Sequence, residues 1–170
     1  MADNNESVNK NEAAAEAVAP KKADNPEQNN SSKKSENNKE KEKSRKKQQL
    51  EALLKDRSPF EAKLIKRVFN ERYGLVDKSL LSKDKEVIFT TMRILGEMRV
   101  DKYVDPIAQV VSDAADPEFR KAAANSLALM KNNRSLFQLI QRLEIEQDPE
   151  VKDAIMNAIR SIHNKGAEAE

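Results

Sequence analysis

A phrase that starts a helix recurs about every 32 residues in this chain, and a repeat of that length strongly constrains the fold. The phrase reads DPEF at 116–119 and DPEV at 148–151, and a weaker copy, DKEV, stands at 84–87. In each copy the Asp can accept a hydrogen bond from a free backbone N–H, and the Glu lies at the positive end of the helix dipole. In two copies Pro also fixes the backbone of the first turn. The sequence therefore predicts three equivalent helices.

Each helix start is followed by apolar and small residues in matching places, which form one stripe along a helix of about four turns. Further helices are expected at about 102–112 and 135–147, and their apolar residues also align at the repeat spacing. Short loops make each helix pair an antiparallel hairpin. Since one hairpin cannot bury both of its apolar faces, about two and a half hairpins must stack into a solenoid. The matching residues are Val87, Thr90, Thr91, Ile94, Leu95 and Met98; Phe119, Ala122, Ala123, Ser126, Leu127 and Met130; and Val151, Ala154, Ile155, Ala158, Ile159 and Ile162.

Composition divides the chain into a tail, a cap and the repeats. The first part holds few apolar side chains, and ordering it would cost more conformational entropy than burial could return. With 3 Gly and 4% aromatic residues, the chain as a whole favours an all-α fold. The predicted segments are a disordered charged tail at 1–47, an N-terminal helical cap at 48–82, the repeat solenoid at 83–165 and a frayed C-terminus at 166–170.

The cap contains a specific helix start. SPFE at 58–61 is a Ser-x-x-Glu capping box with Pro at the first helical position, and Gly74 fits the C-terminal stop of the same helix. This helix carries a wide apolar stripe, so we interpret it as the first layer of the core. Its Lys63, Lys66 and Arg67 lie largely on other faces, which leaves a partner or a membrane surface open as their target.

Charge and cysteine content narrow the function. The net charge is only +2, so it selects neither nucleic acid nor an anionic membrane as the partner. Without cysteine there can be no disulfide, thiolate nucleophile or Cys-ligated zinc, and a cytoplasmic location is expected. The sequence shows neither a secretory signal nor an apolar run long enough to cross a bilayer.

One stretch of the tail, KKSENNKEKEKSRKK at 33–47, is distinctly basic. It is a candidate site for RNA, DNA or an acidic protein, since Lys and Arg attract phosphate and carboxylate groups. Interspersed Glu residues weaken that attraction, and the stretch has no aromatic side chain on which a base could stack. We therefore interpret it chiefly as a solubilising linker.

The repeats resemble a known family. DPEVK at 148–152, DPEFRKAA at 116–123 and ILGEM at 94–98 are similar to the bacterial HEAT-like repeat, of the type named after phycobilin lyases. VDPI at 104–107 is similar to the start of that repeat's second helix. The resemblance covers about 83–164 and implies a short right-handed HEAT/armadillo-like α-solenoid. For function it implies only a range, because such repeats serve as scaffolds, lyase chaperones, inhibitors and DNA-repair enzymes.

The chain also departs from the family pattern in places. Thr90 and Thr91 replace alanines in the first copy, and Gly96 has no counterpart at Ala128 or Ser161 in the later copies. The first copy is therefore a weaker match to the pattern than the second.

No residue pattern of an enzyme stands out. The single histidine, His163, falls at the end of the last predicted helix, where its side chain would interact favourably with the negative end of the helix dipole. The sequence has no Gly-rich phosphate loop, HExxH motif or calcium-loop pattern. The acidic pairs Asp113/Asp116 and Glu144/Glu146 fall at helix ends, where carboxylates are commonly solvated and no raised pKa is expected. The sequence thus predicts a protein with no catalytic, cofactor-binding or metal-binding residues.

The remaining candidate is a surface for a partner. In HEAT-like solenoids the second helices line the concave side, so their outward side chains are candidate contacts. Gln109 and Gln141 share one repeat position and could hydrogen-bond an extended peptide, although for each residue we favour the interpretation as an ordinary solvated polar side chain. Aromatic and Arg side chains contribute most where interfaces exist. The candidates are Tyr103, Gln109, Ser112, Phe137, Gln138, Gln141 and Arg142.

The last repeat supplies a further candidate because no second helix follows it. Met156 lies off the apolar stripe of this last helix. It is either an ordinary exposed residue or part of an end face that docks a partner or another copy of the chain. In the second case weak self-association is expected.

Three functions follow from these features. The favoured one is a non-enzymatic protein–protein binding or scaffold protein, whose HEAT-like surface receives another protein. The second is a nucleic-acid-binding accessory factor that uses 33–47 and the basic face of helix 58–73. The third, an accessory subunit of a cofactor-attaching lyase, is implied by the family resemblance alone.

Overall fold

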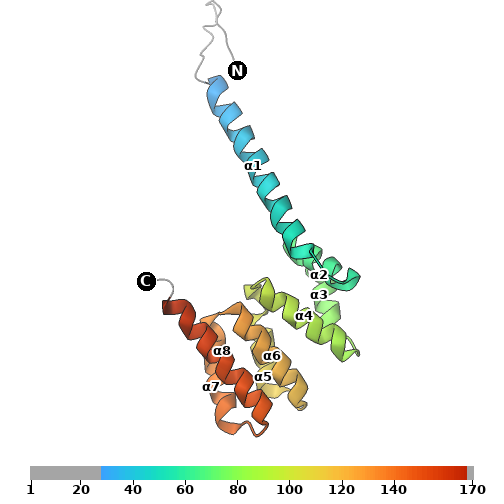
Figure 1. Cartoon of the computed structure of the whole chain (residues 1–170), viewed down its shortest axis with the longest axis vertical. Helices are drawn as coiled ribbons and strands as arrows, with labels where there is room; N and C mark the ends of the chain where they lie inside the picture. Colours follow the sequence, from blue (N-terminus) through green and yellow to red (C-terminus); the bar gives the residue numbers. More distant parts are fainter. Residues whose placement is uncertain (1–27, 168–170) are drawn as a thin grey trace, which may run out of the picture. The chain divides into compact units, whose positions relative to one another are not determined.

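The computed structural model describes residues 28–167, and all of their regular secondary structure is helical (Figure 1). The all-α prediction is thereby confirmed. The chain divides into two compact units after Lys43, and helix α1, Gln28–Leu54, has residues in both. The cap and the repeats belong to the second unit, which begins at Ser44.

Helix α1 begins at Gln28, so the prediction of a disordered tail is wrong for residues 28–47. The segment holds no Gly or Pro and is rich in Lys, which loses little side-chain freedom in a helix. Opposite charges one turn apart add to this, as in the 3.9 Å pair of Lys47 and Glu51. The rest of the predicted tail, 1–27, lies outside the described residues.

The cap is built from α2 (Pro59–Phe69) and α3 (Gly74–Leu80). The predicted capping box is confirmed: the Ser58 N–H donates to Glu61 Oε2 at 2.8 Å, and the Glu61 N–H donates to Ser58 Oγ at 3.3 Å. The apolar stripe of α2 is core, as predicted. Its buried members are Leu64, Ile65 and Val68, and Leu50, Leu53 and Leu54 of α1 pack against the same core.

The predicted end of α2 is wrong. The helix ends at Phe69, and Gly74 starts α3 instead of stopping α2. The chain turns at Glu71, whose φ of 55° is in the left-handed region. A non-glycine residue therefore takes the conformation that the sequence assigned to Gly74, which no local propensity predicts.

Helices α4 (Lys85–Glu97), α6 (Pro117–Met130) and α8 (Pro149–Ala167) are the three equivalents predicted from the repeated phrase. In each, the capping Asp accepts a hydrogen bond of 2.9 Å from the backbone N–H of the Glu two residues on. The helices lie side by side with α6 in the middle (Figure 1). Helix α8 continues through Gly166, so the predicted fraying is wrong for 166–167; a glycine inside a helix costs only about 1 kcal/mol.

The second layer consists of α5 (Val104–Asp113) and α7 (Leu136–Ile145). One turn of 3₁₀ helix leads into each, at Asp101–Tyr103 and at Asn133–Ser135. Helix α5 packs against α6 and α7, and α7 packs against α8. The hairpins α4–α5 and α6–α7 followed by α8 alone confirm the predicted two and a half hairpins.

Replacing Ala123 by leucine is expected to lower the free energy of unfolding by about 1–3 kcal/mol. Ala123 has no exposed surface, because α6 is packed between α4, α5 and α8. Urea unfolding followed by circular dichroism measures the change. Asn125→Leu, at an exposed position of the same helix, is the control and should stay within about 0.5 kcal/mol of wild type. Equal midpoints for the two variants would contradict the packing of α6.

Candidate functional site

A buried ion pair joins the two helices of the second repeat, and its arginine also contacts the loop that leads in from the first repeat. Arg120 of α6 donates from Nε to Glu146 Oε2 at 2.7 Å and from Nη2 to Glu146 Oε1 at 2.8 Å. Its Nη1 donates to the backbone carbonyls of Ala114 and Ala115, at 2.9 and 2.8 Å. One guanidinium therefore fastens the α5–α6 loop and α6 to the end of α7.

The prediction that Glu144 and Glu146 are both solvated is wrong for Glu146, which is 1% exposed. Besides Arg120, its carboxylate accepts hydrogen bonds from Arg142 Nε at 2.9 Å and from the next two backbone N–H groups. The hydrogen bonds from Arg120 lower the pKa of Glu146 far below its usual range, and they outweigh the opposing effect of burial. This carboxylate is held ionised and binds α6 to the end of α7. A glutamate at a helix end gives no sequence signal of such burial.

Two predicted contact residues are used inside the fold. Tyr103 is only 4% exposed, and its hydroxyl donates to Asp77 Oδ1 at 2.6 Å. Burial and then this hydrogen bond raise the pKa of Tyr103. The prediction that Tyr103 faces outward is wrong, because it belongs to the 3₁₀ turn before α5 and not to the outer face of the helix. The Arg142 head group is directed to Glu146 and to the carbonyl of Ser112, at 3.1 Å.

The glutamines of the second layer lie at the surface to different extents. Gln109 and Gln141 are exposed at equivalent positions of α5 and α7, and Gln109 donates to Asp113 Oδ2 at 3.1 Å. Gln138 is half-buried, and its Oε1 is buried without a hydrogen-bond partner among the described residues. Ser112 is half-buried as well. Gln109 and Gln141 are therefore both accessible to a partner, and their role in binding a peptide stays a prediction.

An apolar groove of about 530 Å³ lies between α3 and α5. Helix α3 has 7 residues against 10 in α5, so it leaves part of α4 and α5 uncovered. Gln109 and Asp113 are the only residues with polar side chains in the lining. The lining residues are Leu80, Ile88, Met92, Pro106, Ile107, Gln109, Val110, Asp113, Ala114 and Phe119. Such a groove suits an apolar side chain of a partner.

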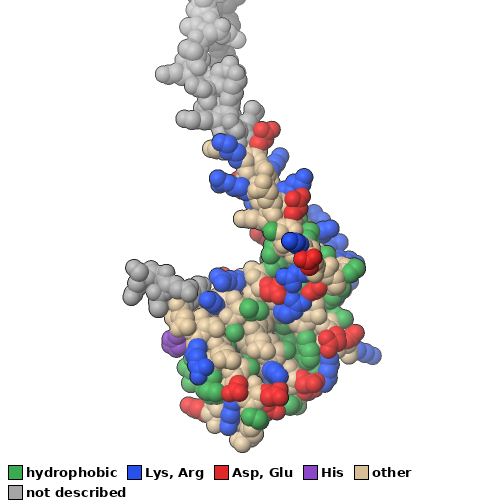
Figure 2. Space-filling view, viewed as in Figure 1, with side chains coloured by type: hydrophobic (Ala, Val, Ile, Leu, Met, Phe, Trp, Pro, Cys, Tyr) green, Lys and Arg blue, Asp and Glu red, His purple; other side chains and the backbone are tan. Residues whose placement is uncertain are grey.

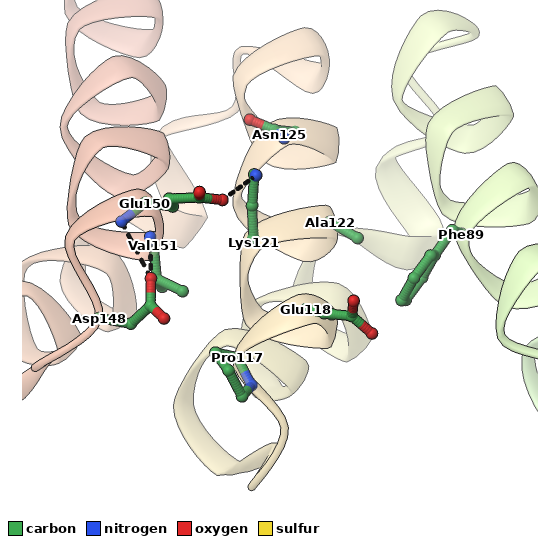
Figure 3. Close-up of a pocket in the computed structure, with 9 residues that line it drawn as sticks. All are labelled: Phe89, Pro117, Glu118, Lys121, Ala122, Asn125, Asp148, Glu150 and Val151. Carbon is green, nitrogen blue, oxygen red and sulfur yellow. Dashed lines mark hydrogen bonds and ion pairs between the residues drawn. The ribbon is translucent and has the colours of Figure 1, made fainter.

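A second cavity, of about 330 Å³, lies among the first helices of the repeats (Figure 3). Figure 3 shows Lys121 of α6 directed at Glu150 of α8, with which it forms an ion pair. Asp148 accepts hydrogen bonds from the backbone at the start of α8, and Glu118 pairs with Lys85 at 2.8 Å. Because each charged side chain already has a partner, we assign this cavity to repeat packing rather than to a ligand.

Helix α7 exposes three apolar side chains, of which the sequence predicted Phe137 as a contact but not Ile140 or Ile145. Phe137, which was predicted as a rim contact, is 67% exposed, and Ile140 and Ile145 are 46% and 65% exposed. Figure 2 shows hydrophobic side chains at the left edge of the molecule, over α7 and below the single histidine. A stripe of isoleucines normally indicates core, so the pattern alone does not mark these two as exposed.

Residues 75–160, which run from α3 into α8, match the family of HEAT repeats. The chain belongs to the HEAT repeat family. The predicted HEAT-like character is thus confirmed at the level of the family. A search of curated proteins and a search of solved structures each gave no match.

Successive HEAT repeats cover one another, which explains why several small side chains are fully buried. Ala108 of α5 has no exposed surface, and α7 packs on this helix. Ala124 and Leu127 of α6 also have none, and α8 packs there. Each of these residues therefore depends on the repeat that follows it.

The last two helices, α7 and α8, carry the positions equivalent to Ala108, Ala124 and Leu127, and no further HEAT repeat covers them in the described chain. One repeat after Ala108 stands Ile140, which is 46% exposed. One repeat after Ala124 stands Met156, and Ile159 likewise follows Leu127; both are half-buried. Met156 is thus neither fully exposed nor core. We define the end face as Phe137, Ile140, Met156 and Ile159.

Charge follows the same HEAT register. Lys152 stands one repeat after Arg120, whose partner Glu146 lies at the end of α7, the second helix of the same repeat. In the part of the chain that the structure describes, Lys152 has no carboxylate within ion-pair distance. The end face therefore has an unpaired cation beside its apolar side chains.

Three further sequence expectations concern this HEAT-repeat chain. His163 is exposed on α8, which continues to Ala167, so it does not stand at the helix end as predicted. Among residues 28–167, no cluster of His, Cys, Asp and Glu could hold a metal ion. None of the described helices is long and apolar enough to span a bilayer.

Proposed function

We propose that this HEAT-repeat chain is a non-enzymatic protein-binding module and that its end face receives another protein. The observation that carries the proposal is the exposure of Ile140 at a position whose equivalent, Ala108, is fully buried one repeat earlier. Contiguous exposed apolar surface is typical of interaction sites, and helical repeat stacks commonly serve protein–protein interaction. The proposed setting is the cytoplasm, with which a cysteine-free chain is compatible.

The chemistry of the partner follows from the repeat register. The preceding repeat meets its cover through helices, so a pair of amphipathic helices fits the end face. In that repeat Arg120 meets a glutamate at the end of the repeat's own second helix, α7. A carboxylate on the partner, placed opposite Lys152, would therefore make the equivalent ion pair. Phe137 is the largest exposed apolar side chain of the end face and the expected anchor.

Ile140→Glu is expected to weaken partner binding at least tenfold, about 1.4 kcal/mol, because a carboxylate would be buried against apolar side chains. A photo-cross-linker in place of Phe137 identifies the partner, and calorimetry with the purified partner measures the affinity. Lys152→Glu is expected to weaken the same complex by charge reversal. Both variants change side chains that are not fully buried, so their melting temperatures should match that of wild type.

Leu81→Glu is the matched control, because Leu81 is 85% exposed and lies after α3, outside the end face. This variant should bind the partner as wild type does. Equal affinities for Ile140→Glu and wild type would overturn the proposal, as would cross-links confined to the α3–α5 groove. Light scattering on wild type and Met156→Glu tests self-association. A dimer that this substitution abolishes would identify a second copy, not a different protein, as the occupant.

No described contact favours an accessory subunit of a cofactor-attaching lyase, which was implied by the family resemblance alone. The α3–α5 groove lacks the support that comparison with the buried Ala108 gives to the end face. We therefore rest the function on the end face.

A further inference from the structure

Five Lys and Arg side chains gather on the cap, and all are exposed. Lys63, Lys66 and Arg67 come from α2, Arg72 from the turn after it, and Lys78 from α3. They line two adjoining hollows of about 400 and 360 Å³. Lys63, Arg67 and Arg72 border both hollows, so the two form one continuous track. We call these five residues the cap cluster.

The cap cluster has no internal counter-charge. No carboxylate lines either hollow, and no carboxylate of the described chain forms an ion pair with any of the five. Six cations of the repeats, by contrast, each bridge to a carboxylate. The bridged ones are Lys85, Arg93, Arg120, Lys121, Arg134 and Arg142. Like charges gathered in a hollow repel one another and attract a polyanion.

We propose that the cap cluster binds the phosphate backbone of duplex nucleic acid without reading its bases. The guanidinium groups of Arg67 and Arg72 can each hold two phosphate oxygens, and a continuous track suits consecutive phosphates. No aromatic side chain lines either hollow, so the stacking that favours single strands is missing. The one large apolar side chain, Leu75, is half-buried and offers little to insert into a bilayer.

This site is independent of the end face. Most of the cap cluster precedes residue 75, where the family match begins. The sequence indicated a basic face on one helix only, while the structure adds Lys78 from α3 and shows the hollows. Loss of protein binding at the end face would leave this inference intact.

The test is the salt dependence of binding by the full chain to a random-sequence DNA duplex, followed by fluorescence anisotropy. Each phosphate contact contributes about 0.9 to the slope of log affinity against log salt. Lys63→Ala/Arg67→Ala/Arg72→Ala is therefore expected to reduce the slope by about 2.7 and to weaken binding at least tenfold at about 50 mM salt. The fold should be unaffected, because the three side chains are exposed.

The control is Lys83→Ala/Arg99→Ala/Arg160→Ala, which removes the same charge from exposed positions elsewhere. It should keep the wild-type slope. A slope that is equal in the cap-cluster variant and wild type would overturn the proposal, as would an equal reduction in the control. Polyglutamate and vesicles containing phosphatidylserine are the competing probes. Tighter binding of either one than of the duplex, lost in the same triple variant, would assign the cluster to an acidic protein or a membrane and overturn it too.

Discussion

Glu146→Ala is expected to lower the free energy of unfolding by about 3–5 kcal/mol, the usual effect of breaking a buried ion pair. The substitution leaves the Arg120 guanidinium 8% exposed and without its carboxylate. It also removes the acceptor for Arg142 and for two backbone N–H groups at the start of the α7–α8 loop. Urea unfolding at pH 7 measures the loss.

Two further variants serve as a control and as a rescue for this prediction. Glu144→Ala removes an exposed carboxylate from the same helix and should change stability by no more than about 0.5 kcal/mol. Arg120→Met/Glu146→Leu replaces both charges with apolar groups and should recover much of the lost stability. The recovery stays incomplete, because Arg120 also satisfies two loop carbonyls. Equal stability of Glu146→Ala and Glu144→Ala would show that the pair does not hold α6 to the end of α7.

The same carboxylate gives the fold an acid sensitivity of defined sign. The Arg120 hydrogen bonds lower the pKa of Glu146 in the folded state, so the folded protein binds the proton less readily than the unfolded chain. The contribution to stability is therefore complete above the unfolded pKa of about 4.5 and is lost as the pH falls below it. Unfolding of wild type and Glu146→Ala over a pH series tests this. The difference between them should shrink in acid, and Glu61, whose pKa is lowered to about 2 by Ser58 and Arg93, should leave both with some acid sensitivity.

The parts of the fold that the sequence predicted are those with a local cause. An Asp cap needs only its own helix start, and the hydrogen bonds at Asp84, Asp116 and Asp148 match the predicted ones. The capping box at Ser58 is equally local. Hydrophobic periodicity then placed the helices of the repeats, because a stripe has to face a neighbour whatever that neighbour is.

The parts that the sequence did not predict depend on residues distant in the chain. Glu146 is buried because Arg120 reaches it across 26 positions, and Tyr103 turns inward to meet Asp77 at the same separation. Neither partner can be chosen from sequence spacing alone. Helix α1 is a different case. It begins at Gln28 although this part of the chain holds few apolar side chains to bury, and this lack of burial is the reason why the sequence predicted a disordered tail.

The candidate site, too, was predicted from the sequence only in part. From the sequence, Met156 was a candidate for an end face, because no second helix follows the last predicted one, and Phe137 was a candidate contact. It did not single out Ile140, whose exposure becomes evident only by comparison with the buried Ala108. Register within the repeats would have found it, since any position covered by the next repeat is uncovered in the last one.

Gly96→Leu is expected to destabilise the protein by about 3 kcal/mol or more, at the upper end of overpacking effects. A β-carbon at Gly96 of α4 would lie 2.8 Å from the backbone oxygen of Ser126 and 3.1 Å from Leu129 Cβ. A backbone oxygen cannot move aside without separating α4 from α6. The Ser126 hydroxyl also donates to the carbonyl of Met92 at 2.5 Å, so the contact is fixed from both helices. Thermal and urea unfolding measure the effect.

The smaller substitution separates this contact from helix propensity. Alanine favours a helix over glycine by about 1 kcal/mol, so Gly96→Ala would stabilise α4 if the space were open. Gly74 provides that case, because nothing lies within 4 Å of its added β-carbon, and Gly74→Ala should be neutral or slightly stabilising. Gly96→Ala should instead destabilise, since the contact with Ser126 outweighs the propensity gain. Stabilisation by both substitutions would mean that α4 and α6 do not approach as closely as described. Gly96, which has no counterpart in the later copies, would then have no role in packing.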